Sequence, residues 1–99
     1  MKSFRKFVEE SKKYKPTSTE LNDLRKEVNK IKPSVISRST NSGFYVEVDC
    51  KKENNSYEVT DATVTALNGI TSYWNGNHKH GIDWEMPDST KSQVYISFK

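Results

Sequence analysis

The sequence contains a single cysteine, no long apolar run and no catalytic signature. One cysteine excludes an internal disulfide bond and fits a reducing compartment. No apolar stretch approaches the roughly 20 residues that a membrane span needs, and the charged N-terminus lacks the apolar centre of a secretory signal. We therefore expect a soluble protein that is made in a cytoplasm and has no membrane partner.

Apolar residues are also scarce. They make up 32% of the 99 residues, against 29% charged residues, so we expect one domain, residues 1–99, with a thin core. Eleven aromatic side chains supply much of the area that this core can bury.

Positive charge is concentrated at the front of the chain. Residues 1–33 hold ten basic and five acidic residues, whereas residues 34–99 hold six and eight. The net charge of +3 thus divides into +5 and −2, and the boundary coincides with a change in hydrophobic period at Lys32-Pro33. This pattern indicates a basic front piece joined to a mildly acidic back piece.

Residues 43–50 show the clearest strand pattern in the sequence. Apolar side chains alternate there with more polar ones, which is the period of a strand with one buried face. The buried set is predicted to be Phe44, Val46, Val48 and Cys50. Turn residues precede and follow this stretch, so we expect it to be the central strand of a small sheet.

Two amphipathic helices are predicted in the basic front piece. Residues 2–14 carry one apolar stripe, and Lys15-Pro16 ends that helix. Thr17 and Glu20 have the spacing of a capping box for a second helix. Its apolar seam consists of Leu21, Leu24, Val28 and Ile31. The stripes of this helical hairpin must face each other, the sheet or a second copy of the chain, which leaves a homodimer open.

The back piece is predicted to be mainly β. We expect residues 34–38 to pair with 44–50, residues 51–55 to connect tightly into 57–59, and 82–85 to form a last hairpin with 91–99. Val94, Ile96 and Phe98 share one face, which we expect to meet Phe44, Val46, Val48 and the helices in one core. The predicted fold class is α+β, with the helical hairpin packed on a small antiparallel sheet.

Residues 60–74 are compatible with two structures. Asn68-Gly69 between β-branched residues is a strong hairpin signal. A helix capped by Thr60 or Asp61 would instead form an apolar stripe able to cover the sheet, and we favour this helix. The stripe would contain Ala62, Ala66, Ile70 and Trp74 at steps of four, with Leu67 and Tyr73 beside them. Residues 75–81 are predicted to be an exposed loop.

The candidate chemistry of this loop is weakly specified. His78 and His80, with Asp83 and Glu85 nearby, suggest a metal site or the base of a small hydrolase or nuclease, but nothing fixes their geometry. Cys50 alternates with buried residues and is predicted to be a packed thiol rather than a nucleophile. We expect no cofactor, no bound metal and no catalytic residues.

Two surfaces are candidates for binding. Basic residues of the predicted hairpin could neutralise phosphates or meet an acidic protein; they are Lys12, Lys13, Lys15, Arg25, Lys26 and Lys30. The second surface is aromatic and nearly neutral, with Tyr73, Trp74 and His78, where Trp74 is predicted to be the anchor.

The N-terminus carries the one family resemblance in the chain, within Met1-Lys2-Ser3-Phe4-Arg5-Lys6-Phe7-Val8-Glu9-Glu10-Ser11. It resembles the capsid-targeting peptide of internal head proteins of T-even-type bacteriophages. Those peptides begin with Met-Lys, a hydroxyl residue and an aromatic residue, and end at a glutamate that the prohead protease cuts. Val8-Glu9-Glu10 followed by Ser11 is similar to that cleavage pattern.

The resemblance implies a small viral protein that is packaged in the virion and injected to act on a target in the host cytoplasm, such as a defence nuclease. The first hypothesis is therefore a non-enzymatic, anti-defence protein that binds and inhibits or modulates a host protein. A small basic nucleic-acid-binding protein is the alternative, and a hydrolase using His78 and His80 is the third.

Overall fold

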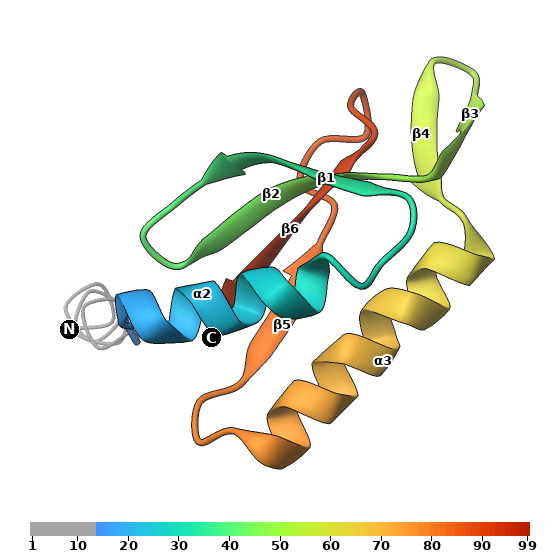
Figure 1. The fold of residues 1–99 in the computed structure, drawn as a ribbon. Helices are drawn as coiled ribbons and strands as arrows, with labels where there is room; N and C mark the ends of the chain where they lie inside the picture. Colours follow the sequence, from blue (N-terminus) through green and yellow to red (C-terminus); the bar gives the residue numbers. More distant parts are fainter. Residues whose placement is uncertain (1–13) are drawn as a thin grey trace, which may run out of the picture.

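The computed structural model describes residues 14–99 and confirms the α+β class (Figure 1). Its elements are α2 (Ser18–Val28), β1 (Ser34–Ser39), β2 (Gly43–Val48), β3 (Cys50–Glu53), β4 (Ser56–Val59), α3 (Asp61–Asn77), β5 (Ile82–Glu85) and β6 (Gln93–Phe98). The helix predicted over 2–14 lies outside the described residues except for Tyr14, so the helical hairpin stays a prediction. No helix within residues 14–99 is long and apolar enough to cross a membrane.

Four strands form an antiparallel sheet in the order β1-β2-β6-β5, and β3 and β4 form a separate two-stranded ribbon. The predicted pairings of the first and last hairpins are confirmed, and β2 lies inside the sheet as expected. The central strand is shorter than predicted, because it ends at Val48. Its neighbours end there too: Val48 is opposite the first residue of β1, and β6 starts opposite Glu47. Cys50 instead begins β3.

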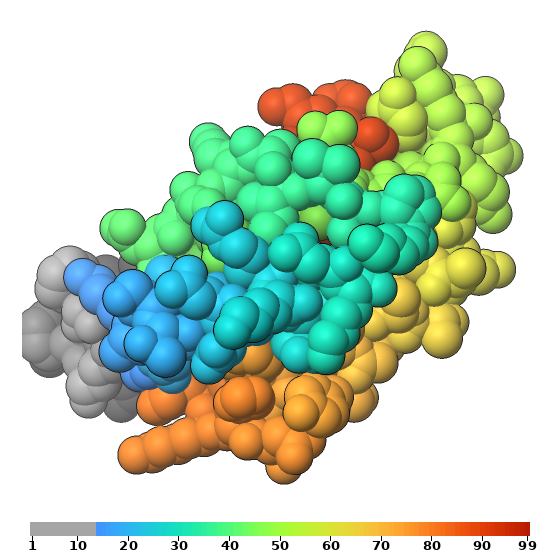
Figure 2. Space-filling model, viewed as in Figure 1, coloured from blue at the N-terminus to red at the C-terminus, as the bar shows by residue number. Residues whose placement is uncertain are grey.

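One face of this sheet, together with α2 and α3, encloses the core. Every second residue of the central strands points to this face, and the six residues predicted to share it are all buried: Phe44, Val46, Val48, Val94, Ile96 and Phe98. They belong to one apolar cluster with residues of α2 and α3. Figure 1 shows α2 crossing the sheet, and in Figure 2 the surfaces of α2 and α3 adjoin in this view. We call this the covered face.

The second predicted helix is confirmed, together with its capping box. The Thr17 hydroxyl accepts from the Glu20 N–H at 3.2 Å, and the Glu20 carboxylate accepts from the Thr17 N–H at 2.9 Å. Leu24 and Val28 are fully buried, and Ile31 is 2% exposed although it lies beyond the last turn. Helical spacing thus directs the seam at the sheet, where it covers β2.

Residues 60–74 form a helix, as favoured, and α3 continues through Asn77. Thr60 caps it, and the side chain of Asn75 accepts from Ile82 N–H at 2.8 Å. The predicted loop 75–81 is therefore wrong for its first three residues, because Asn75 uses the last helical turn to hold the start of β5. The buried stripe is Thr63, Leu67 and Trp74. Ala62 is exposed, so the expected stripe was displaced by one residue at its start.

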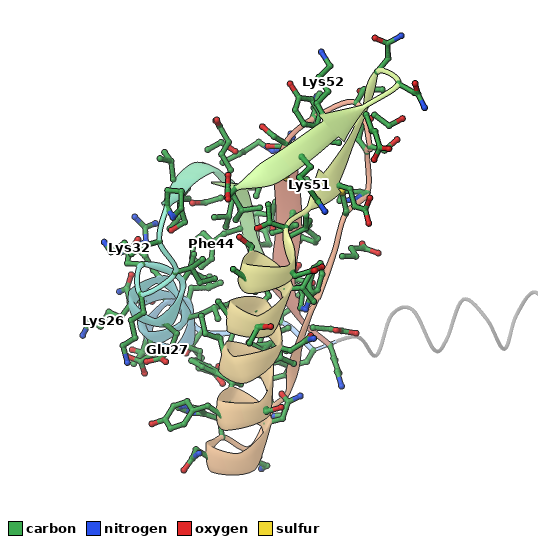
Figure 3. All side chains as sticks on the ribbon, turned by 90° about the vertical axis from the view of Figure 1, so that its right-hand side faces the viewer. Lys26, Glu27, Lys32, Phe44, Lys51 and Lys52 are labelled. Atoms are coloured by element: carbon green, nitrogen blue, oxygen red, sulfur yellow. The ribbon has the colours of Figure 1, made fainter. Side chains whose placement is uncertain are left out.

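The β3–β4 ribbon projects away from the helices (Figures 1 and 3). Its turn residues Asn54 and Asn55 have φ angles of 50° and 67°, the left-handed conformation that asparagine tolerates in a two-residue hairpin loop. The Tyr57 N–H donates to the Ser89 carbonyl at 2.7 Å, which ties the ribbon to the loop before β6. The tight connection predicted over 51–55 is thus the end of β3 and its turn.

Candidate functional site

The predicted basic site is only partly available in the structure. Lys12 and Lys13 lie outside the described residues. Arg25 stands over the Phe44 ring, 5.3 Å from its centroid, and the Lys30 ammonium pairs with Glu27 at 2.9 Å. Lys15 and Lys26 are exposed, and Figure 3 shows Lys26 pointing away from the body.

The distribution of charge also argues against a basic binding face on the described part of the chain. Residues 1–13 contain five basic and two acidic residues, whereas residues 14–99 contain eleven of each. The whole net charge of +3 thus comes from the first thirteen residues, and the part that the structure describes is neutral. A neutral body attracts a phosphate backbone weakly, because nonspecific nucleic-acid affinity depends on excess positive charge.

The predicted aromatic surface is wrong in its central residue. Trp74 is 1% exposed, packs edge-on against Phe98 with centroids 5.6 Å apart, and is part of the core. Its indole N–H donates to the His80 carbonyl at 2.9 Å. Trp74 lies on the inner side of α3, so it cannot anchor a partner. Tyr73, one position along the helix, is 53% exposed.

The two histidines do not converge on one site. His78 stacks on Trp74 with centroids 3.8 Å apart, whereas His80 stacks on Tyr14 at 3.5 Å. The Tyr14 hydroxyl in turn donates to Glu20, so His80 helps to fix the chain where it enters α2. Residues 14–99 contain no group of three His, Cys, Asp or Glu side chains arranged to hold a metal ion.

Cys50 is a free, half-buried cysteine that packs against the core, so the predicted packed thiol is confirmed. Its predicted place among the buried residues of the central strand is wrong, because Cys50 begins β3. Burial and the charge of Asp49 raise the pKa of its thiol. A raised pKa keeps the sulfur protonated at neutral pH, and the thiol is a poorer nucleophile than the thiolate.

The sheet face opposite the helices carries the most organised surface group, and we call it the open face. One side chain from each strand aligns across it in a row, in the order Arg38, Tyr45, Tyr95 and Glu85. The Arg38 guanidinium carbon lies 4.1 Å from the Tyr45 ring centroid, and the two tyrosine rings are 4.5 Å apart. The row therefore runs from a cation through two aromatic rings to an anion. We call it the cross-strand row.

Local structure fixes the members of this row. A register shift between Ile36 and Arg38 inserts Ser37 into β1, and such bulges redirect side chains. Ser37 and Arg38 consequently both reach open-face neighbours, Gln93 and Tyr45 respectively. The Tyr95 hydroxyl lies 2.7 Å from the hydroxyl of Thr40 and 3.0 Å from that of Ser42, so the β1–β2 turn holds this ring in place.

Charge is also divided along the open face. Arg38 and Lys91 lie toward β1, whereas Asp83 and Glu85 lie on β5 at the opposite edge. Tyr45 and Tyr95 are half-buried between them. The arrangement can bind a polar surface with defined orientation, because its two ends have opposite charge and its centre offers aromatic contact area.

Sequence reasoning missed the cross-strand row. The alternation over residues 43–50 puts Tyr45 on the face opposite Phe44 and Val46, which is the available signal. The pairing of Tyr45 with Tyr95, however, depends on strand register across 50 positions of sequence. Comparison of the chain with protein-family models, with curated proteins and with solved structures gave no match.

Proposed function

We propose that the protein is a non-catalytic binding module that occupies another protein through its open face. The observation that carries this proposal is the cross-strand row, Arg38–Tyr45–Tyr95–Glu85, on a sheet face that the described helices leave uncovered. Tyrosine and arginine are the residue types that protein interfaces favour, and they supply a large share of binding hot spots.

The row is also organised before any partner arrives. Stacking holds Arg38 against Tyr45, and hydroxyl contacts hold Tyr95. Immobilising a flexible side chain on association costs roughly 0.5–1.5 kcal/mol in conformational entropy. Side chains that are already ordered avoid most of this cost. This favours binding without rearrangement of the sheet.

A protein fits the open face better than a nucleic acid does. Two tyrosines and an arginine could stack on bases, but Glu47, Asp83 and Glu85 share this face and would repel phosphates. Opposite charges at its two edges suit a protein surface of mixed charge.

The N-terminal resemblance supports a host protein as the partner. On this proposal the protein is a phage accessory protein that reaches the host cytoplasm and blocks or modulates a target, such as a defence nuclease, by occupying it. Blocking requires no reaction centre.

Affinity capture with matched variants tests the proposal. We would immobilise the wild-type protein, an Arg38→Ser/Tyr45→Thr variant of the open face, and a Lys26→Ser/Tyr73→Thr variant of the helix side, and expose each to nuclease-treated bacterial lysate. We expect a discrete protein on the wild type and on the helix-side variant, and its loss from the open-face variant. With the purified partner, the open-face variant should bind at least about 30-fold more weakly, as for a hot spot of about 2 kcal/mol.

Three results would contradict the proposal. If the open-face variant binds as well as the wild type, the open face is not the binding surface. If only the helix-side variant loses binding, the partner binds α2 and α3 instead. A species that is captured from untreated lysate but not from nuclease-treated lysate would favour nucleic-acid binding instead. Circular dichroism of each variant checks that the fold is retained.

A further inference from the structure

A hollow of about 380 Å³ lies at the β1 end of the open face, between the bulge of β1 and the loop that leads into β6. Its lining includes Ser37, Arg38, Tyr45, Asp88, Lys91 and Gln93. These residues come from β1, β2, β6 and the preceding loop, so the strand register and the bulge together build the hollow.

Two cations border the hollow. The Arg38 guanidinium lies over the Tyr45 ring and has no carboxylate within 4 Å among residues 14–99. A guanidinium over a ring can still offer its planar fork of N–H groups to the two oxygens of a carboxylate. Lys91 is exposed and likewise has no carboxylate partner within this part of the chain.

A neutral donor completes the lining. The Ser37 hydroxyl shares its one proton between the Gln93 side-chain carbonyl at 3.1 Å and the Tyr45 backbone carbonyl at 3.2 Å. The Gln93 NH₂ group has no acceptor within residues 14–99. This NH₂ group is a free donor at the same hollow.

Asp88 is the one acidic residue of the lining, and its carboxylate is already engaged. It accepts the Thr90 hydroxyl at 2.6 Å and the Thr90 N–H at 2.9 Å. These two bonds hold the pKa of Asp88 below its ordinary value, with a smaller lowering from nearby Lys91. Asp88 therefore shapes the loop, and the hollow keeps an excess of one positive charge.

From these observations we infer that the hollow is a carboxylate site and takes an aspartate or glutamate side chain of the partner protein. This inference rests on the proposed function, since it names the chemistry that the open face recognises. The opposite end of the cross-strand row, at Glu85, lies three strand spacings away, about 14 Å. The partner surface should thus present an acidic residue at the hollow and a basic residue about 14 Å from it.

The carboxylate site can be tested without the partner. We would titrate the full-length protein at pH 7 and low salt with N-acetyl-glutamate methylamide, and follow backbone and side-chain N–H signals by NMR. The matched probe is N-acetyl-glutamine methylamide, which has nearly the same shape without the charge. We expect saturable shifts of Ser37, Arg38 and Gln93 with the glutamate probe only, with a Kd in the millimolar range.

Two variants test whether the glutamate probe binds at the hollow. Arg38→Gln should weaken the glutamate probe at least about threefold, consistent with an exposed charge pair. Lys26→Gln, on the helix side, should leave its Kd unchanged. The inference would be overturned by equal shifts with both probes or by shifts confined to α2. It would also be overturned if binding did not saturate up to about 50 mM probe, the highest concentration of the titration.

A second measurement separates this inference from the proposed function. With the purified partner, unchanged affinity of Arg38→Gln together with loss of binding in Tyr45→Thr would overturn the carboxylate site and leave the binding face intact. Unchanged affinity in both variants would overturn the proposed function itself.

Discussion

The two faces of the four-stranded sheet are built from the same strands but differ in the contacts that their side chains make. On the covered face, apolar side chains such as Phe44 and Ile96 are buried under two helices. On the open face, their sequence neighbours Tyr45 and Tyr95 form specific contacts with arginine and hydroxyl groups. Alternation along each strand assigns successive residues to opposite faces.

The difference separates stability from recognition. Truncating a side chain on the covered face leaves a cavity, and introducing an acidic or basic residue there buries a charge. Both changes lower the free energy of unfolding. Open-face side chains remain in contact with water, so their loss changes the folded state much less. A variant can therefore be assigned to one role by measuring unfolding and binding separately.

The largest expected effect is at the centre of the covered face. Val46 is fully buried, so Val46→Asp would place an unpaired carboxylate in the core at a cost of about 5 kcal/mol or more. We expect no cooperative urea transition for this variant. The adjacent Glu47→Asp, on the open face, should change the free energy of unfolding by less than about 0.5 kcal/mol. A folded, cooperative Val46→Asp variant would mean that the two faces have been exchanged.

A smaller loss is expected where α2 contacts the sheet. Leu24 is 0% exposed within a single chain, so Leu24→Ala should destabilise by about 2–5 kcal/mol. The loss should not depend on protein concentration, because the sheet of the same chain already covers this seam. A melting temperature that rises with concentration would instead indicate a homodimer through α2.

Gly43 tests how closely the central strands approach. A Cβ at this position would overlap the Ile96 carbonyl oxygen and lie 2.6 Å from the Ser97 Cα, and both obstacles are backbone. Gly43→Ala should therefore cost roughly 2–3 kcal/mol in urea unfolding. Gly69→Ala is the matched control, since nothing lies within 4 Å of its Cβ position in α3. It should stabilise the protein by up to about 1 kcal/mol, and an equal loss in both variants would contradict the close approach.

The smallest effect concerns the start of α2, at the margin of the covered face. The Thr17 N–H and, next, the Tyr14 hydroxyl lower the pKa of Glu20 below its ordinary value of 4.5. A carboxyl group with a lowered folded pKa contributes stability above its unfolded pKa and loses it as pH falls through the folded value. Stability of the wild type relative to Glu20→Gln should thus be constant near neutral pH and shrink below about pH 4.5. A difference that persists unchanged at pH 2 would show that the charge contributes nothing.

Sequence reasoning identified the covered face because burial of one side leaves a periodic signal. The alternation from Phe44 to Val48 and the capping box at Thr17 are local patterns, and both are confirmed. Helix 60–74 was harder, because Asn68-Gly69 also fits a hairpin. The structure shows Asn68 and Gly69 on the exposed side of α3, so the turn signal there is overridden by burial of Leu67 and Trp74.

The open face could not be predicted in the same way. Polar residues on an exposed face have no required period, and the contact of Arg38 with Tyr45 depends on one inserted residue in β1. For Trp74 the sequence supports two conflicting predictions: the apolar stripe at steps of four places it against the sheet, whereas the aromatic surface places it outside. The structure confirms the stripe, because Trp74 is buried against Phe98.

The central claim is that one face builds the fold while the other binds a partner. Hydroxyl-radical footprinting of the wild-type protein, free and in complex with the captured partner, tests it directly through three tyrosines. Tyr45 and Tyr95 lie on the open face, and Tyr73 is 53% exposed on α3 as an internal reference. We predict that complex formation reduces oxidation of Tyr45 and Tyr95 severalfold and leaves Tyr73 unchanged. Protection of Tyr73, with Tyr45 and Tyr95 labelled as in the free protein, would contradict the claim and place the partner on the helices.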